Sequence, residues 1–344
     1  MSADQNTTIR ESYLERNRTH NEIRRGGAIG NLNDGIEITT HGIPTRLITW
    51  PGNGFQTESV HVLTHHPGDE TPMYSYGMAE EAMLCLKGKG EVFLRGRWVG
   101  VEPGDIAYFP EGIEHASRNP EGTEKEFIVV SSLSPPPFDL YEPFGLYDKE
   151  QGVMRFEAIE EAKKTARIGN LSPRNEMHLN NSHPELRAQS LDPEDIRIEG
   201  ALFNAFLGAA YHGFEPAHMP DFGKAHMVLN LWPGYGVKST GFHFAHGLPI
   251  MATRIHSHPV TDECLILWEG KGQFYCGDRW VEAETFDCVL APCGVRHQVK
   301  GRENPLAGGW FGGGFASPPQ LDLYMETEYY KGGKFSRPPF VKLA

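Results

Sequence analysis

The sequence predicts an all-β fold built from two similar domains. Shifting the chain by 182 residues aligns its first half with its second half, without a gap over most of a domain. In both halves, short apolar segments are bounded by Pro, Gly, Asn or Asp, as strands joined by turns usually are. The 39 Gly and 25 Pro residues are typical of a chain with many short strands. We therefore expect a duplicated β domain.

The elements expected in the first half begin with a helix. The polar N-terminus carries a capping pattern that predicts a helix from Thr7 to about Arg18. Short strands follow from about residue 38 onward, and Arg95-Gly96 is typical of a hairpin turn, matched by Gly277-Asp278 in the second half. The expected strands are Leu47–Trp50, Val60–Thr64, Ala82–Leu86, Glu91–Leu94, Ile106–Phe109 and Glu126–Ser131.

A connector is expected between the halves, and it is only partly helical. Helical periodicity with mixed charge predicts a helix from Met154 to Arg167. The segment Pro173–Asp195 is polar and irregular, so its His178 and His183 are expected to be solvated. Gly200–Ala210 is apolar and is expected to lead into the second domain, whereas the aromatic tail Tyr324–Ala344 is expected to pack on the other domain.

The repeat is strongest around a Trp-Pro-Gly turn and a longer stretch that follows it. Trp50 aligns with Trp232 and Glu81 with Glu263, and 12 of the 35 positions from 81 to 115 are identical in the two copies. A Gly-x-Gly turn and prolines at fixed offsets also recur. Chance similarity does not account for such a pattern, so the two halves are expected to share one fold.

The second half carries the residues of a single metal site. His256 and His258 are two positions apart, so on an extended strand their side chains point to the same face. Glu263 on the next strand and His297 on a later one can reach the same point. Three imidazole nitrogens and one carboxylate oxygen suit a divalent transition metal, whereas Ca and Mg prefer oxygen. We predict one ion per chain, with Fe(II) favoured and Mn(II), Ni(II) or Zn(II) as alternatives.

The spacing of these residues resembles the motifs of the cupin family. Four residues separate His258 from Glu263, and six separate Glu263 from Gly270; Gly247 lies upstream. The second cupin motif ends in Pro-x-Gly-x-x-His, which is matched here by Pro292, Gly294 and His297. One departure is Phe286, which stands where many cupins have a glycine. With the repeat, this resemblance implies a bicupin, with two double-stranded β-helix (jelly-roll) barrels in one chain.

The expected organisation has five parts. They are an N-terminal arm (1–44), an N-terminal barrel (45–141), a partly helical connector (142–224), a C-terminal barrel (225–325) and a tail (326–344). The resemblance also implies a homodimer. Arms of this kind often pack on the partner barrel or on a second subunit.

The first copy lacks half of the metal ligands. Tyr74 and Tyr76 align with His256 and His258, while Glu81 and His115 remain. Tyrosine, with a pKa of about 10, is a poor ligand for a divalent ion at neutral pH. The first barrel is therefore interpreted as a structural partner with a satisfied polar interior. The alternative is a metal-free pocket that binds a small molecule through the four residues of this cluster.

Further residues are candidates for contact with a substrate. Arg254 alternates with His256 and His258, so it is expected to point inward and either to hold a substrate carboxylate or to form a salt bridge. His246 aligns with Thr64 and is a functional candidate, whereas His243 aligns with His61 and is expected to be structural. Gln273 and Tyr275 share one face of a strand and line the pocket if that face is inward.

Composition excludes several classes of partner. The net charge of -13 argues against nucleic acid and anionic membranes, and no apolar run approaches the ~18 residues of a membrane span. Five Cys, without a Cys-x-x-Cys motif or a signal peptide, indicate a cytoplasmic protein. Cys293, near the predicted site, is either a small residue in a turn or a reactive thiol. The expected partner is a small molecule, for which a carboxylate is one option.

Three functions remain open on the sequence alone. The ligand set suits a mononuclear iron dioxygenase, and bicupins of this length resemble gentisate 1,2-dioxygenase, which keeps its metal in the first barrel. A hydrolase or isomerase is the second option, because the bicupin (S)-ureidoglycine aminohydrolase carries its Mn in the second barrel. The third option is a non-catalytic ligand-binding bicupin. A dioxygenase acting on a small polar or aromatic organic acid is the favoured interpretation.

Overall fold

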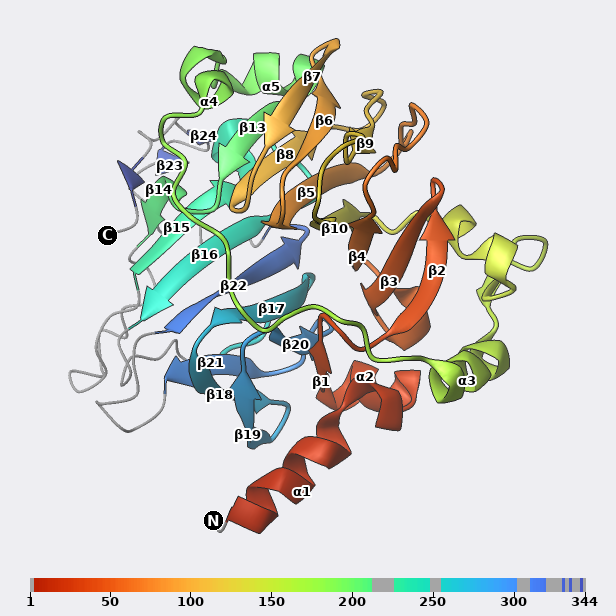
Figure 1. The fold of residues 1–344 in the computed structure, drawn as a ribbon. Coiled ribbons are helices and arrows are strands. Elements are labelled where there is room, and N and C mark those ends of the chain that lie inside the picture. Colours follow the sequence, from red (N-terminus) through yellow and green to blue (C-terminus); the bar gives the residue numbers. More distant parts are fainter. Residues whose placement is uncertain are drawn as a thin grey trace.

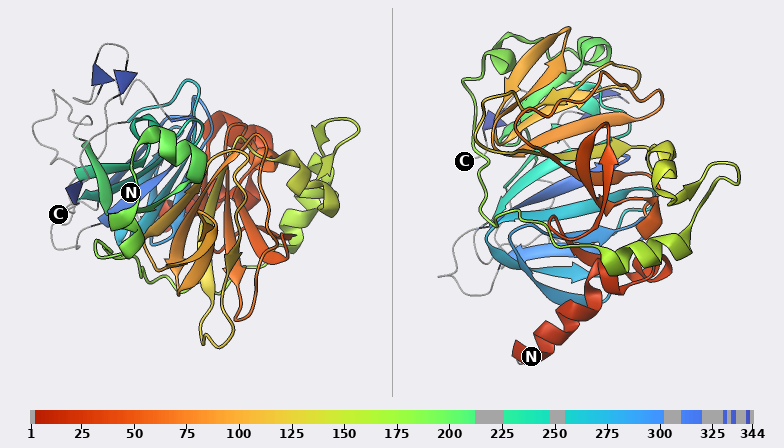
Figure 2. Two further views of the ribbon diagram at one scale, coloured as in Figure 1. Left: turned by 90° about the horizontal axis from the view of Figure 1, so that it is seen from above. Right: turned by 45° about the vertical axis from the view of Figure 1, so that its right-hand side comes forward.

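The computed structural model describes residues 3–211, 226–247, 255–301, 310–319, 330–331, 334–335 and 341–342. Within these residues the chain forms two β-barrels that lie side by side, as the sequence predicted (Figures 1 and 2). Arg254 and most of the aromatic tail lie outside the described residues. No helix in the described part of the chain is long and apolar enough to cross a membrane.

The N-terminal barrel consists of a seven-stranded sheet facing a three-stranded one. The large sheet has the strand order β13-β8-β5-β10-β4-β3-β2, and the small sheet the order β7-β6-β9. The strands are β2 (Ile36–Thr40), β3 (Ile43–Thr49), β4 (Ser59–His65), β5 (Glu80–Lys87), β6 (Gly90–Leu94), β7 (Arg97–Val101), β8 (Asp105–Phe109), β9 (Ser117–Arg118), β10 (Phe127–Ser134) and β13 (Ala201–Asn204). All six strands expected in this half are present, and Arg95 and Gly96 have the positive φ values of a type I′ hairpin turn.

The C-terminal barrel repeats this arrangement strand by strand. Its large sheet has the order β1-β20-β17-β22-β16-β15-β14, and its small sheet the order β19-β18-β21. The strands are β1 (Ala28–Asn31), β14 (Leu207–Tyr211), β15 (His226–Leu231), β16 (Phe242–Gly247), β17 (Asp262–Glu269), β18 (Lys271–Cys276), β19 (Arg279–Glu284), β20 (Asp287–Ala291), β21 (His297–Gly301) and β22 (Trp310–Ser317). The single pairing of β13 with β14 joins the two large sheets.

Each barrel is completed by a strand that precedes the other barrel in the sequence. β1 leaves the N-terminal arm and pairs with β20 of the C-terminal barrel, whereas β13 leaves the connector and pairs with β8 of the N-terminal barrel (Figure 1). The arm therefore packs on the C-terminal barrel. This exchange of β1 and β13 between the barrels was not predicted. A second repeat in the sequence accompanies it: residues 19–31 resemble residues 192–204 at an offset of 173.

The second repeat is a short helix followed by a glycine and a strand. Helices α2 (His20–Gly26) and α5 (Pro193–Glu199) are capped by the side chains of Thr19 and Asp192. Each helix ends at a glycine with positive φ, Gly27 or Gly200, and the next residue begins the exchanged strand. Gly27 lies against β20 and Gly200 against β8, so a side chain at either position would collide with the backbone of that strand.

The remaining helices lie in the arm and the connector. The arm contains α1 (Ala3–Tyr13) and the 3-10 turn η1 (Glu15–Asn17), close to the expected helix. The expected connector helix is confirmed as α3 (Phe156–Thr165). The other short elements are η2 (Pro51–Asn53), η3 (Phe138–Leu140), η4 (Glu142–Phe144), β11 (Tyr147–Asp148), β12 (Val153–Met154), α4 (Pro184–Ala188), η5 (Pro233–Tyr235), β23 (Tyr330–Lys331), β24 (Lys334–Phe335) and β25 (Val341–Lys342).

Apolar side chains are buried inside the barrels, between the barrels, and where the connector covers β2 and β3. The interior of the N-terminal barrel is filled by one cluster of aliphatic and aromatic side chains, including Met83, Phe109 and Phe127. A larger cluster runs from the interface between the barrels into the C-terminal barrel and includes Trp232 and Trp268. Because both barrels bury apolar surface against each other, they are expected to form one cooperative unit.

Candidate metal centre

The four predicted metal ligands meet inside the C-terminal barrel. His256 and His258 lie on the segment leading into β17, Glu263 is the second residue of β17, and His297 begins β21. One donor atom from each of these residues lies within 4.8 Å of the others. The centroids of the three imidazole rings are 4.4 to 5.0 Å apart. The structure thus brings together the whole predicted set.

Glu263 is the common partner within this cluster. One of its oxygens, Oε2, lies 2.5 Å from Nε2 of His258 and 3.0 Å from Nε2 of His297. The three side chains are buried, whereas His256 is partly exposed. A buried carboxylate surrounded by imidazole nitrogens is the donor arrangement that a divalent transition metal requires.

Backbone contacts position all three histidines of the cluster. His256 and His297 exchange backbone hydrogen bonds of 3.1 and 2.8 Å, which places the two segments side by side. The N–H of Gly294 donates to the carbonyl of His258 at 2.8 Å. Nδ1 of His297 is 3.0 Å from the carbonyl of Val295, to which it donates, so Nε2, on the side of Glu263, is the nitrogen that would bind a metal. Such a second contact is usual for histidine ligands.

The electrostatics of the cluster favour an anionic carboxylate. Burial by itself raises the pKa of Glu263, but His297 and His258 together hold it well below its usual range. Burial lowers the pKa of His297, yet the nearby Glu263 carboxylate outweighs this effect and raises it. A divalent cation can supply the positive charge that the carboxylate demands here. The donor set therefore fits the predicted ion, with three nitrogens and one oxygen from the protein.

The N-terminal barrel has the same backbone frame around a different polar cluster. Tyr74 and His115 exchange backbone hydrogen bonds of 3.0 and 2.9 Å, and the N–H of Gly112 donates to the carbonyl of Tyr76 at 2.8 Å. Nδ1 of His115 lies 2.7 Å from the carbonyl of Ile113. Each of these contacts has its counterpart around the metal cluster, so the two sites differ in side chains and share their scaffold.

Side chains of the N-terminal barrel satisfy one another. Glu81 accepts hydrogen bonds from Tyr74 at 3.2 Å and from Ser131 at 2.6 Å, and it lies 2.8 Å from Nε2 of His115. Burial, followed by the Glu81 charge, raises the pKa of Tyr74 well above its usual range, so its hydroxyl remains a proton donor. The Tyr76 hydroxyl pairs with His41 at 2.8 Å. This network supports the structural interpretation of the first site.

The substrate candidates named from the sequence are placed differently. Cys276 pairs across the sheet with His297 and so shares its inward face, which puts Gln273 and Tyr275 on the opposite face of β18. Gln273 donates to Glu282 at 2.6 Å, and the ring of Tyr275 packs against Trp280. The expectation that Gln273 and Tyr275 line the pocket was wrong, because the register could not be fixed from the sequence.

Two other candidates remain predictions. His246 lies in β16, where its backbone pairs with His226 and Phe311, and Arg254 lies outside the described residues. His243, which the repeat had assigned to a structural role, comes within 3.7 Å of Glu263 Oε1. Its counterpart His61 instead contacts the hydroxyl of Tyr141 at 3.2 Å. The repeat alone could not reveal this difference, because the partners diverge.

Comparisons with known proteins agree with the two-barrel fold. A family model described as a cupin domain matches residues 61–131 and 251–306, one match in each barrel. A putative glyoxylate-induced protein from Pseudomonas aeruginosa is a similar solved structure, with 15% identity and a TM-score of 0.56, covering 85% of this chain and 89% of its own. Protein YlbA from E. coli, of the DUF861 family, has 10% identity and a TM-score of 0.54, covering 85% and 91%.

A third similar structure is a variant of salicylate 1,2-dioxygenase from Pseudoaminobacter salicylatoxidans. It has 12% identity and a TM-score of 0.49, covering 82% of this chain and 78% of its own. No curated protein sequence matches the chain. At these identities the proteins from Pseudomonas aeruginosa and E. coli show the fold alone.

Proposed function

We propose that this chain, in which a cupin domain matches once in each barrel, is an enzyme with one metal centre in the C-terminal barrel. The observation that carries the proposal is the set of three histidines and one glutamate, buried except for the partly exposed His256, whose donor atoms lie within 4.8 Å of one another. The N-terminal barrel, whose polar cluster is satisfied internally, has a supporting role in this proposal.

The favoured reaction is the oxidation of a small polar or aromatic organic acid by dioxygen. Iron(II), held by the three histidines and Glu263, would supply the chemistry that activates dioxygen beside a bound substrate. Four protein donors leave room for exogenous ligands on a six-coordinate ion. His297, held by Val295, and Glu263, fixed between two imidazoles, orient their donor atoms toward one point before any ligand arrives.

The first experiment is elemental analysis of protein purified under argon without chelator or added metal. About one iron per chain supports the dioxygenase, since histidine-carboxylate sites of this kind serve iron and dioxygen. Oxygen uptake would then be measured with gentisate-like, catechol-like and diketone substrates. Activity that is lost on chelation and restored by Fe(II), and not by Zn(II), is the expected result.

Other metals would redirect the assignment. The same ligands with Mn, Ni or Zn favour a hydrolase or isomerase, because such ions act as Lewis acids or activate bound water. Ureido compounds and sugar acids would then be screened for ammonia release and isomer exchange. If the purified protein does not bind about one transition metal ion per chain, both enzyme proposals are contradicted. A non-catalytic ligand-binding bicupin then remains.

A further inference from the structure

Two buried acidic residues connect the barrels at equivalent positions. Glu80 begins β5 and Asp262 begins β17, and each directly precedes the carboxylate of its barrel's polar cluster. Successive side chains of a strand point to opposite faces. Glu81 and Glu263 therefore point into their own barrels, while Glu80 and Asp262 point toward the neighbouring barrel.

Asp262 holds the loop before β4 of the N-terminal barrel. Its Oδ2 accepts the backbone N–H groups of Gln56 at 2.6 Å and Thr57 at 2.8 Å. The hydroxyl of Thr57 accepts the N–H of Asp262 at 3.2 Å and donates to the carbonyl of Ser317 at 2.5 Å. One threonine of the N-terminal barrel is thus bonded to β17 and to β22, two adjacent strands of the metal barrel.

The other oxygen of Asp262 holds the turn that leads to His297. Oδ1 accepts the N–H of Cys293 at 2.8 Å, in the turn that leads to His297. The next residue of this turn, Gly294, holds the carbonyl of His258. One buried carboxylate therefore fixes the strand of Glu263 and the turn of His297, and does so against a loop of the other barrel.

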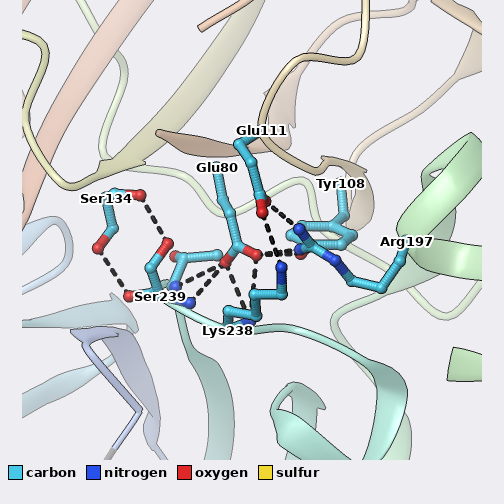
Figure 3. Close-up of polar contacts among 8 residues, drawn as sticks. Glu80, Tyr108, Glu111, Ser134, Arg197, Lys238 and Ser239 are labelled. Carbon is cyan, nitrogen blue, oxygen red and sulfur yellow. Dashed lines mark hydrogen bonds and ion pairs between the residues drawn. The ribbon is translucent and has the colours of Figure 1, made fainter. Parts of the chain in front are cut away.

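Glu80 makes the corresponding contact in the opposite direction (Figure 3). Its carboxylate accepts the backbone N–H groups of Lys238, Ser239 and Thr240, the last two at 2.7 and 3.0 Å. The Ser239 hydroxyl donates to the carbonyl of Ser134 at 2.6 Å, as Thr57 does to Ser317. This contact supports β5 and Glu81, in the barrel that lacks two metal ligands.

From this geometry we infer that Asp262 and Thr57 are positioning residues of the metal centre. They make the N-terminal barrel, which has no complete ligand set of its own, part of the support that fixes the donors of Glu263 and His297. The inference rests on the proposed metal binding in the C-terminal barrel. It assigns a role in metal binding to the contact between Asp262 and Thr57, and only a structural role to the contact between Glu80 and Ser239.

The decisive comparison is Thr57→Val against Ser239→Ala. Each variant removes a hydroxyl that donates to a carbonyl of the other barrel, and Thr57→Val also removes the acceptor of the Asp262 N–H. A purely structural role predicts lower stability in both variants without a change in Co(II) affinity. Co(II) affinity would be measured by competition with a chromophoric chelator, together with the visible absorption of bound Co(II). Thr57→Val, in the barrel without metal, is expected to weaken Co(II) binding about 10-fold, as loss of outer-shell support does. Ser239→Ala, in the metal barrel itself, is expected to leave the affinity unchanged.

A second pair, Asp262→Asn and Glu80→Gln, tests the carboxylates. We expect an affinity loss of about 10- to 100-fold for Asp262→Asn only, with an altered Co(II) spectrum. The inference would be overturned if both members of each pair lost Co(II) affinity equally. It would also be overturned if neither Thr57→Val nor Asp262→Asn lost Co(II) affinity. If Asp262→Asn does not fold, the hydroxyl pair decides. Wild-type protein that binds no Co(II) contradicts the metal centre itself, whereas wild-type binding with unchanged variants contradicts only the positioning role.

Discussion

At the scale of the residue, the two barrels place different side chains on the same backbone arrangement. Tyr74 and His256 occupy equivalent backbone positions, because Tyr74 pairs with His115 and His256 pairs with His297. In one barrel the carboxylate is satisfied by hydroxyl and imidazole groups of the protein, and in the other mainly by imidazoles. Side-chain identity at two positions therefore separates a structural cluster from a candidate metal centre.

The first residue-scale prediction concerns these positions. His256→Ala is expected to abolish stoichiometric metal binding and activity, because it removes one of four donors. Tyr74→Phe removes one hydrogen bond to Glu81, which costs about 1 kcal/mol of stability, and leaves the metal content unchanged. Elemental analysis of both purified variants checks the pair. A His256→Ala protein that keeps its full metal content would show that the ligands have been assigned wrongly.

The second residue-scale prediction concerns acid stability. Burial lowers the pKa of His61 and of His65 to about 4, whereas an unfolded chain binds these protons at about 6.5. Between these values the unfolded state binds more protons, so the free energy of unfolding falls as the pH drops from about 6.5 to 4. The loss is expected to reach about 3 kcal/mol for each histidine, at 1.36 kcal/mol per pKa unit.

Urea unfolding at several pH values measures this effect. His65→Gln is expected to flatten the dependence on pH, while the matched control His66→Gln, at an exposed neighbouring position, should leave it in place. A wild-type protein with the same free energy of unfolding at pH 4.5 and pH 7 would contradict the prediction.

At the scale of the element, the helix–glycine–strand units decide how the barrels are completed. Gly27 has φ 67°, and a Cβ there would lie 2.7 Å from the carbonyl oxygen of Leu290. The strand that follows pairs along its whole length with β20. Asn31 at its end donates to the buried Asp287 at 2.9 Å, and Asn204 makes the same contact with Asp105 at 3.1 Å. The two helix–glycine–strand units therefore have the same local structure, and each completes the barrel that does not directly follow it in the sequence.

The element-scale prediction is that Gly27→Ala destabilises the protein by about 1–3 kcal/mol, because it combines backbone strain with a steric clash. Gly42→Ala is the matched control: Gly42 also has positive φ, at 86°, but a Cβ there would have no neighbour within 4 Å. Its expected cost is only about 1 kcal/mol, the conformational part. Thermal unfolding of both variants checks the difference, and equal costs would show that the close contact with β20 is unimportant.

At the scale of the whole molecule, the barrels depend on each other in two ways. They exchange strands, and they share the apolar cluster that runs from the interface into the C-terminal barrel. The domain limits inferred from the repeat stay a prediction, yet strands of the arm and of the connector take part in the barrels. The arm supplies β1 to the C-terminal barrel, and the connector supplies β13 to the N-terminal barrel.

The molecular-scale prediction is that deletion of residues 1–31 opens the edge of the C-terminal barrel. Backbone amides of β20 that face β1 lose their partners, so their hydrogen exchange is expected to become much faster. Amides of β8 keep β13 as a neighbour and serve as the internal control. Mass spectrometry of exchanged peptides measures both strands. Unchanged protection of β20 in the truncated protein would mean that the exchanged strand is not needed for closure.

The sequence alone determined the duplication, the strands of the first half, the helix of the connector and the four residues that meet in the candidate metal centre. It could do so because strand periodicity, turn residues and ligand spacing are local properties, and the offset of 182 residues repeats them. The tertiary structure decided which face of β18 points inward, so it excluded Gln273 and Tyr275 from the pocket. It also decided which barrel each of β1 and β13 completes, and it joined Asp262 to Thr57. Such contacts link residues that are distant in the chain, and only packing in three dimensions selects them.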